Sequence, residues 1–146
     1  MTRIWVLSAP LGQRQQVERL LAGFVLPSSW RPQPHSPGAV QLVVEIPTEP
    51  ASIASELAKI GAVFEIEGEG ERYLHHPGLG ILRQEIDGAG EVLIRAGQIS
   101  EALRSSAGSL NDFERRLRIL QGVAWLDLLE PYRLQSPRLR SLPRAV

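Results

Sequence analysis

The sequence predicts an α+β domain with a mixed or largely antiparallel sheet of about five to six strands, helices packed against it and a helical C-terminal third. Short runs of β-branched and aromatic residues separated by turn residues fill the first two thirds, and helical spacing of apolar residues follows. A length of 146 residues fits one core. We therefore expect a single α+β domain over residues 1–134 and a mobile tail containing Arg and Pro over 135–146.

The first third of the chain predicts two strand–helix units. Residues 4–7 are apolar and predict a buried strand, and a helix is expected from about 10–25. The apolar stripe of this helix is spaced i, i+3, i+4 and i+7 and consists of Val17, Leu20, Leu21 and Phe24. Four prolines make 26–38 a loop, after which 40–46 forms a strand and 48–60 a helix.

The middle of the chain predicts a strand meander. Alternating apolar and acidic residues over 62–67 are typical of a half-buried strand. Residues 73–76 and 80–86 form either two strands or one bent strand. The Asp-Gly-Ala-Gly sequence at 87–90 predicts a hairpin turn, with the return strand at 92–94.

The last third predicts helices. Ile99 and Leu103 are four residues apart in a short amphipathic segment, and Ser109 can cap a longer helix after it. The apolar face of the longer helix consists of Phe113, Leu117, Leu120 and Ala124. We expect this helix to end before Pro131, because proline lacks the backbone donor that a helix interior requires.

Composition and charge exclude several kinds of site. The chain has no Cys, which excludes disulfides, thiolate metal sites and cysteine nucleophiles. Its 16 basic and 16 acidic residues balance, whereas nucleic-acid binding normally needs a basic excess, so we do not expect a nucleic-acid partner. There is neither a signal-peptide core near residue 4 nor the run of about 20 apolar residues that spans a membrane. A cytoplasmic protein with no membrane contact is expected.

Aromatic residues divide into an expected core and one expected exception. The core set lies at periodic positions: Trp5, Phe24, Phe64, Phe113 and Trp125. Trp30 stands among prolines and is the aromatic residue that we expect to be exposed, where it can bind a partner. The alternative is that Trp30 covers the core as a lid.

His75 and His76 are the candidate catalytic residues, because adjacent histidines next to a glycine-containing turn can supply a base or a ligand. In a strand, however, neighbouring side chains point to opposite faces, so the two rings cannot serve one centre directly. A catalytic zinc site made of histidines would also need His35. We therefore predict no metal ligands. The segment also lacks both the G-x-G-x-x-G spacing and the lysine of a phosphate-binding loop, and we predict no cofactor.

Four glutamates share one face at strand spacing: Glu65, Glu67, Glu69 and Glu71. Four like charges on one face predict exposure to solvent. We therefore expect an exposed edge strand, rather than a catalytic carboxylate pair in a cleft. The sequence also contains no G-x-S-x-G elbow for a serine nucleophile.

Several short motifs follow one another through most of the chain: Ser8-Ala9-Pro10, Leu21-Ala22-Gly23, Trp30, Pro37-Gly38, Tyr73, Pro77, Leu79-Gly80-Ile81, Asp87, Gly90, Gly122-Val123-Ala124-Trp125 and Leu129-Glu130-Pro131-Tyr132-Arg133. Together they resemble an uncharacterised actinobacterial family called domain of unknown function 3145. The closing block, from Ala124-Trp125 through Leu129-Glu130-Pro131-Tyr132-Arg133, is the most specific part, because it combines two rare aromatics with a helix-ending proline at fixed spacing. The family usually closes with Arg-Trp-Leu-His, where this chain has Arg138-Leu139-Arg140.

The resemblance implies a cytosolic actinobacterial protein, which agrees with a chain whose only lysine is Lys59. It implies no established activity. Members lie near fatty-acid synthesis genes, so it implies a protein partner among lipid-synthesis enzymes. Our first hypothesis is a non-catalytic accessory or protein-interaction domain, with contacts from Trp30, Glu130, Tyr132, Arg133 and the Arg-rich tail. The alternative is a small enzyme or ligand-binding domain with its site around His75 and His76.

Overall fold

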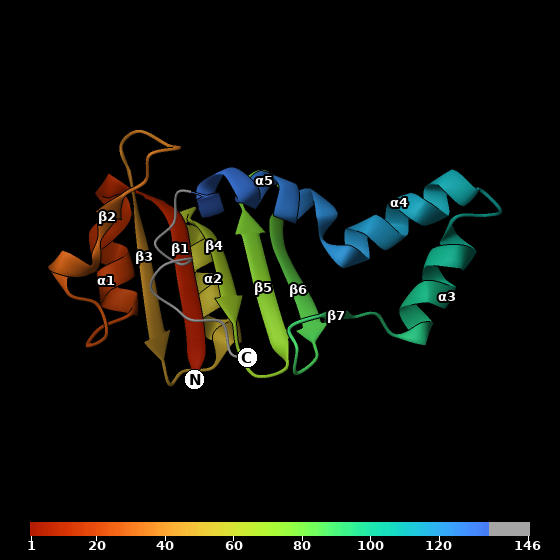
Figure 1. The fold of residues 1–146 in the computed structure, drawn as a ribbon, viewed down its shortest axis with the longest axis horizontal. Helices are drawn as coiled ribbons and strands as arrows, with labels where there is room; N and C mark the ends of the chain where they lie inside the picture. The colour runs from red at the N-terminus through yellow and green to blue at the C-terminus, as the bar shows by residue number, and fades with distance from the viewer. Residues whose placement is uncertain (135–146) are drawn as a thin grey trace.

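The computed structural model describes residues 1–134, in which seven strands form one antiparallel sheet (Figure 1). The strands are β1 (Thr2–Pro10), β2 (Arg31–Pro32), β3 (Ala39–Ile46), β4 (Val63–Glu67), β5 (Glu71–His76), β6 (Gly80–Ile86) and β7 (Val92–Leu93). Their order across the sheet is β2-β3-β1-β4-β5-β6-β7. The predicted α+β class is confirmed. The strand count exceeds the prediction because β2 lies in the segment 26–38 that was predicted as a loop, where two residues carry no readable periodicity. The predicted tail, 135–146, lies outside the described residues.

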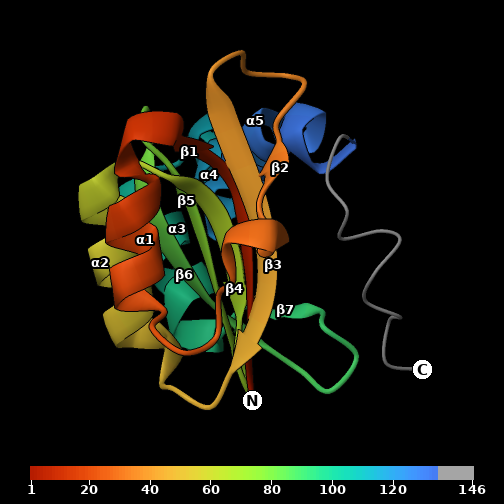
Figure 2. The same cartoon turned by 90° about the vertical axis from the view of Figure 1, so that its left-hand side faces the viewer.

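Helices cover both faces of the sheet (Figure 2). They are α1 (Arg14–Leu20), α2 (Pro50–Ile60), α3 (Ala96–Ser105), α4 (Leu110–Gln121) and α5 (Val123–Leu134), with short 3-10 turns at Leu11–Gln13 and Pro27–Ser29. Helices α1 and α2 pack on one face through Val17, Ile53 and Leu57. Helix α5 packs on the other face through Leu129 and Trp125. The sheet therefore lies between two hydrophobic cores.

Strand β1 has both faces buried, because it lies inside the sheet with helices on either side. Ile4 and Val6 face α1 and α2, whereas Trp5 and Leu7 face α5. This arrangement explains the unbroken apolar run in the sequence, which is typical of strands covered on both faces. Ile4 lies opposite Val44 of β3 and Ile66 of β4.

Two predicted helix boundaries are wrong. The first helix ends at Leu20, and Gly23 takes up a left-handed conformation with φ 86°, which leaves Phe24 48% exposed and outside the core. The long C-terminal helix is two helices, because Gly122 ends α4 with φ 76°. Helix α5 then continues through Pro131 instead of stopping before it. An internal proline removes one backbone hydrogen bond, and packing of the flanking residues on the sheet offsets that loss.

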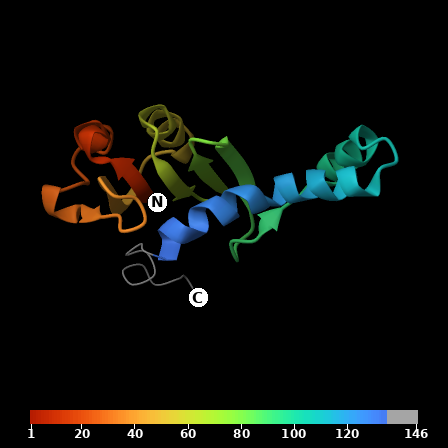
Figure 3. The same cartoon turned by 90° about the horizontal axis from the view of Figure 1, so that it is seen from above.

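Helices α3 and α4 project beyond the β6–β7 edge of the sheet (Figures 1 and 3). We call these two helices, residues 96–121, the arm. The arm joins the sheet near β6, where the Gln84 amide Nε2 donates a hydrogen bond of 3.0 Å to the Leu120 carbonyl. This contact and the turn at Gly122 set the direction in which the arm leaves the sheet.

Candidate functional site

The end of the most specific sequence block, residues 129–133, docks the end of α5 on the sheet. Leu129 is fully buried, and the guanidinium of Arg133 forms an ion pair with the carboxylate of Glu65 on β4. Glu65 is 1% exposed. Two residues 68 positions apart in the sequence therefore join α5 to the middle of the sheet.

The expectation of an exposed acidic edge strand is wrong. Strand β4 lies between β1 and β5, and Glu65 is buried beneath α5. Among the other three carboxylates of the stripe, Glu69 is exposed and Glu71 forms an ion pair of 2.9 Å with Arg83. A buried carboxylate is stable when a cation pairs with it, and the cation here comes from a distant helix that strand periodicity does not reveal.

Tyr132 lies between two histidine rings. Its ring centroid is 4.7 Å from that of His35, edge to face, and 6.4 Å from that of His76. Next to this group, the Gln33 amide Nε2 donates a hydrogen bond of 2.6 Å to the Leu7 carbonyl. The loop before β3 and the end of β5 therefore both contact the last turn of α5.

His75 is part of the packing on the opposite face. Its ring is 5% exposed and stacks on Phe64 with centroids 5.0 Å apart, and its Nδ1 donates a hydrogen bond of 2.5 Å to the Ala62 carbonyl. His76 turns toward α5, and its Nδ1 accepts a 3.0 Å hydrogen bond from the Gly78 amide. The prediction that the two rings face opposite sides is confirmed, so His75 and His76 do not line one site.

Burial gives His75 a predictable effect on stability. Desolvation of the imidazole lowers the pKa of His75 below its ordinary value of 6.5, although the bond to the Ala62 carbonyl acts in the opposite direction. The unfolded chain therefore binds a proton here at a higher pH than the folded chain does. We expect the free energy of unfolding to fall as the pH drops below about 6.5, by up to about 1.4 kcal/mol per pH unit.

Urea unfolding at about pH 7.5 and about pH 5.5 measures this loss. The neutral variant His75→Gln should show a smaller difference between the two pH values than the wild type. The matched control is His35→Gln, at an exposed histidine, and it should keep the wild-type difference. An unchanged difference in His75→Gln would show that His75 does not couple protonation to folding.

Trp30 is buried, and the expectation that it is exposed is wrong. The ring is 9% exposed within the core of α1 and α2, and its Nε1 donates a 2.8 Å hydrogen bond to Glu18. Arg14 lies 5.9 Å from the ring centroid and bonds Glu18 at 3.0 Å. The hydrogen bonds from Arg14 and then from Trp30 lower the pKa of the Glu18 carboxyl. Trp30 is thus the lid that the sequence left as the alternative.

Glu130 is the exposed member of the predicted binding set. Its carboxylate lies 3.9 Å from the guanidinium of Arg133, with most of the side chain in solvent. A binding role for Glu130, Tyr132 and Arg133 stays a prediction, and the contacts of Tyr132 and Arg133 already give these two residues a structural role.

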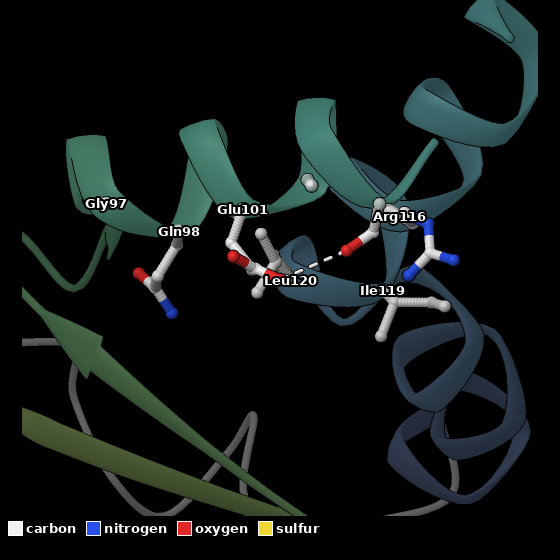
Figure 4. Close-up of a pocket in the computed structure, with 8 residues that line it drawn as sticks. Gly97, Gln98, Glu101, Arg116, Ile119 and Leu120 are labelled. Atoms are coloured by element: carbon white, nitrogen blue, oxygen red, sulfur yellow. Dashed lines mark hydrogen bonds between the residues drawn. The ribbon is translucent and has the colours of Figure 1, made fainter. Parts of the chain in front are cut away.

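The arm contains a cavity of about 400 Å³ between α3 and α4 (Figure 4). Its lining includes Gln98, Glu101 and Ala102 from α3 and Arg116, Ile119 and Leu120 from α4. Ile119 is 45% exposed. The sequence predicted two amphipathic helices here but not a groove between them, because periodicity identifies an apolar face and not what lies against it.

The polar groups at this groove are paired within the arm. Arg116 bonds Asp112 at 2.8 Å, and Glu101 bonds Arg104 at 2.8 Å. Ser105 also donates a hydrogen bond of 3.1 Å to Glu101, and a dashed line marks a hydrogen bond of Glu101 in Figure 4. The groove therefore offers apolar surface bordered by charges that already have partners.

Residues 1–134 contain neither a metal-binding cluster nor a membrane-spanning helix. Within this range, no three His, Asp or Glu side chains gather in a way that could hold a metal ion. No helix of the same range combines the length and the apolar character needed to cross a bilayer.

A family model described as a protein of unknown function, DUF3145, matches residues 4–138. The chain belongs to the DUF3145 family. The match spans the sheet, the arm and α5, so the groove and the block at 129–133 are both parts of the DUF3145 domain. Neither the curated proteins nor the solved structures contain a match to this DUF3145 chain.

Proposed function

We propose that this DUF3145 protein is a non-catalytic accessory protein of the actinobacterial cytoplasm that binds a protein partner through the groove between α3 and α4. The observation that carries the proposal is an apolar groove on an arm that projects from the sheet. Contiguous apolar surface on a projecting element is typical of interaction sites.

The groove suits the apolar face of a helix from the partner. An amphipathic helix places side chains at i, i+3, i+4 and i+7 into such a groove. Because Glu101 and Arg116 are already paired within the arm, burial of Ile119 and Leu120 would supply most of the binding free energy. Enzymes of fatty-acid synthesis are the first partners to test, since the family resemblance implies a neighbourhood of their genes.

The geometry around the histidines does not favour the enzyme alternative. A site there would use His75 or His76, whereas His75 stacks on Phe64 and His76 approaches Tyr132 on the other face. The nearby Glu71 carboxylate is paired with Arg83. These groups all have structural partners, and this argues for a scaffold rather than for catalysis.

A binding experiment with a groove variant tests the proposal. We expect purified fatty-acid synthesis enzymes to bind the immobilised wild-type protein, and Ile119→Glu to weaken that binding by at least about tenfold, because it buries a charge in the contact. The measurement is biolayer interferometry or calorimetry.

The matched control is Leu26→Glu, at an apolar residue 66% exposed near α1 and outside the arm. It should bind like the wild type. If no enzyme of fatty-acid synthesis binds, the proposed partner class is wrong. If Ile119→Glu and the wild type bind equally, the groove is not the contact.

A further inference from the structure

The arm carries three exposed apolar side chains outside the groove. Ile99 and Leu103 are one turn apart on α3, and Leu110 begins α4. None of the three lines the groove. Leu103 is 58% exposed and Leu110 is 68% exposed. We call these three residues the arm face.

The arm buries little apolar surface of its own. Helices α3 and α4 have 10 and 12 residues, which is short for helices that rely on their own hydrogen bonds in water. In the part of the chain that the structure describes, Ala102 is the one hydrophobic side chain of the arm that is fully buried. Helices of this length depend on packing, so a surface that covers the arm face would stabilise the arm.

Acidic and basic residues are separated along α4. Its acidic residues, Asp112 and Glu114, precede its basic residues, Arg115, Arg116 and Arg118. A second α4 helix that packs in the opposite direction places each acidic half against a basic half, and it also opposes the two helix dipoles. The charge pattern of this helix is therefore complementary to a second copy of itself.

The positions of Glu114 and Arg118 along α4 also favour pairing with a second, antiparallel α4. Leu110, Glu114 and Arg118 follow one another at intervals of four residues, so they lie along one side of α4. Glu114 and Arg118 are both exposed, and neither forms an ion pair with another residue of 1–134. These two charges remain available to a partner, whereas Asp112, Arg115 and Arg116 are paired within α4.

We propose that the arm face binds the arm face of a second copy of this chain, with the two α4 helices antiparallel and Glu114 of each copy paired with Arg118 of the other. The arm projects beyond the β6–β7 edge of the sheet, which leaves it accessible to a second arm (Figure 3). The result is a dimer held by a bundle of four helices, two from each copy. This dimer uses residues that do not line the groove and does not depend on the groove partner.

Sedimentation of the full chain between about 1 and 100 μM tests the dimer. We expect a dimer in the wild type, a monomer with Leu103→Glu, and a dimer with Ile119→Glu in the groove and with Leu26→Glu at the other end of the molecule. A wild type that stays monomeric at about 100 μM overturns the inference. A dimer in Leu103→Glu places the contact elsewhere and also overturns it. The inference is also overturned if the wild type is a monomer and a different protein binds at Leu103.

Charge reversal distinguishes antiparallel pairing from loss of folding. Glu114→Arg alone and Arg118→Glu alone each place like charges opposite one another, so each should lower the affinity of the dimer by at least about tenfold. An equimolar mixture of these two variants restores both opposite-charge pairs and should form a dimer again. A mixture that stays monomeric while both variants are folded, as circular dichroism shows, overturns the antiparallel pairing. Groove binding would be unaffected, so the two proposals can fail separately.

Discussion

Gly122→Ala is expected to lower the free energy of unfolding by about 3 kcal/mol. The backbone at Gly122 has φ 76°, a left-handed conformation that costs a residue with a Cβ about 1 kcal/mol or more. A Cβ there would also lie 2.9 Å from both Gln84 Nε2 and Leu82 Cδ2 of β6. Both atoms end side chains that can move, but Gln84 is buried and its amide is held by the hydrogen bond to Leu120, so the overpacking adds about 1 to 2 kcal/mol. Urea unfolding followed by circular dichroism measures the sum.

Gly61→Ala is the matched control for this prediction. Gly61 also ends a helix in the left-handed conformation, with φ 84°, but no atom lies within 4 Å of its hypothetical Cβ. Only the backbone cost of about 1 kcal/mol should therefore appear. Equal losses at the two glycines would show that the contact with β6 does not constrain the turn between α4 and α5.

The same glycine determines where the arm points. Gln84 donates its hydrogen bond to Leu120, two residues before Gly122, and α5 begins directly after the turn. If the alanine pushes α4 away from β6, this hydrogen bond lengthens while the rest of the sheet stays intact. In Gly122→Ala compared with the wild type, amide hydrogen exchange should become faster in the arm and stay unchanged in β1.

The predictable parts of the fold are those in which local pattern and burial agree. Residues 4–7 are apolar on every position because β1 has helices on both faces, and their strand was predicted. The helix around Ile53 and Leu57 was predicted for a similar reason, since its apolar stripe and the stop at Gly61 coincide. Phe24 kept the helical spacing but lies beyond the end of α1, because spacing does not reveal the turn at Gly23.

The candidate site was less predictable because its contacts are not local. Glu65 was expected on an exposed edge, and only the fold brings Arg133 to it. Ile99 and Leu103 were recognised as one side of an amphipathic helix, which normally faces a core, whereas here that side is exposed on the arm. The segment 129–133 was identified as part of the most specific block, but its docking on β4 depends on Glu65, far away in the sequence.

Arg133→Met is the second variant for which we expect a large effect. It removes the guanidinium that pairs with Glu65, a carboxylate 1% exposed at the centre of the sheet. Loss of one partner of a buried ion pair typically costs about 3 to 5 kcal/mol, because the remaining charge keeps its desolvation cost. Chemical unfolding measures the loss. Compared with the wild type, amide hydrogen exchange in Arg133→Met should become faster in α5 and change less in β1.

Arg83→Met is the matched control, because Arg83 pairs with Glu71 at 2.9 Å on the same sheet but is half exposed. An exposed pair contributes about 1 kcal/mol or less, so this variant should stay close to the wild type. Equal losses for Arg83→Met and Arg133→Met would contradict a special role for the buried pair.

A double variant separates the ion pair from simple packing. In Glu65→Leu with Arg133→Met, no charge remains at the buried position, and apolar replacements of similar volume are often nearly neutral. The double variant should therefore be more stable than Arg133→Met alone. If it is less stable, the charge left on Glu65 is not the cause of the loss in Arg133→Met, and the other contacts of Glu65 stabilise the fold. If it is more stable, the pairing of Arg133 with Glu65 is what makes a carboxylate tolerable beneath α5.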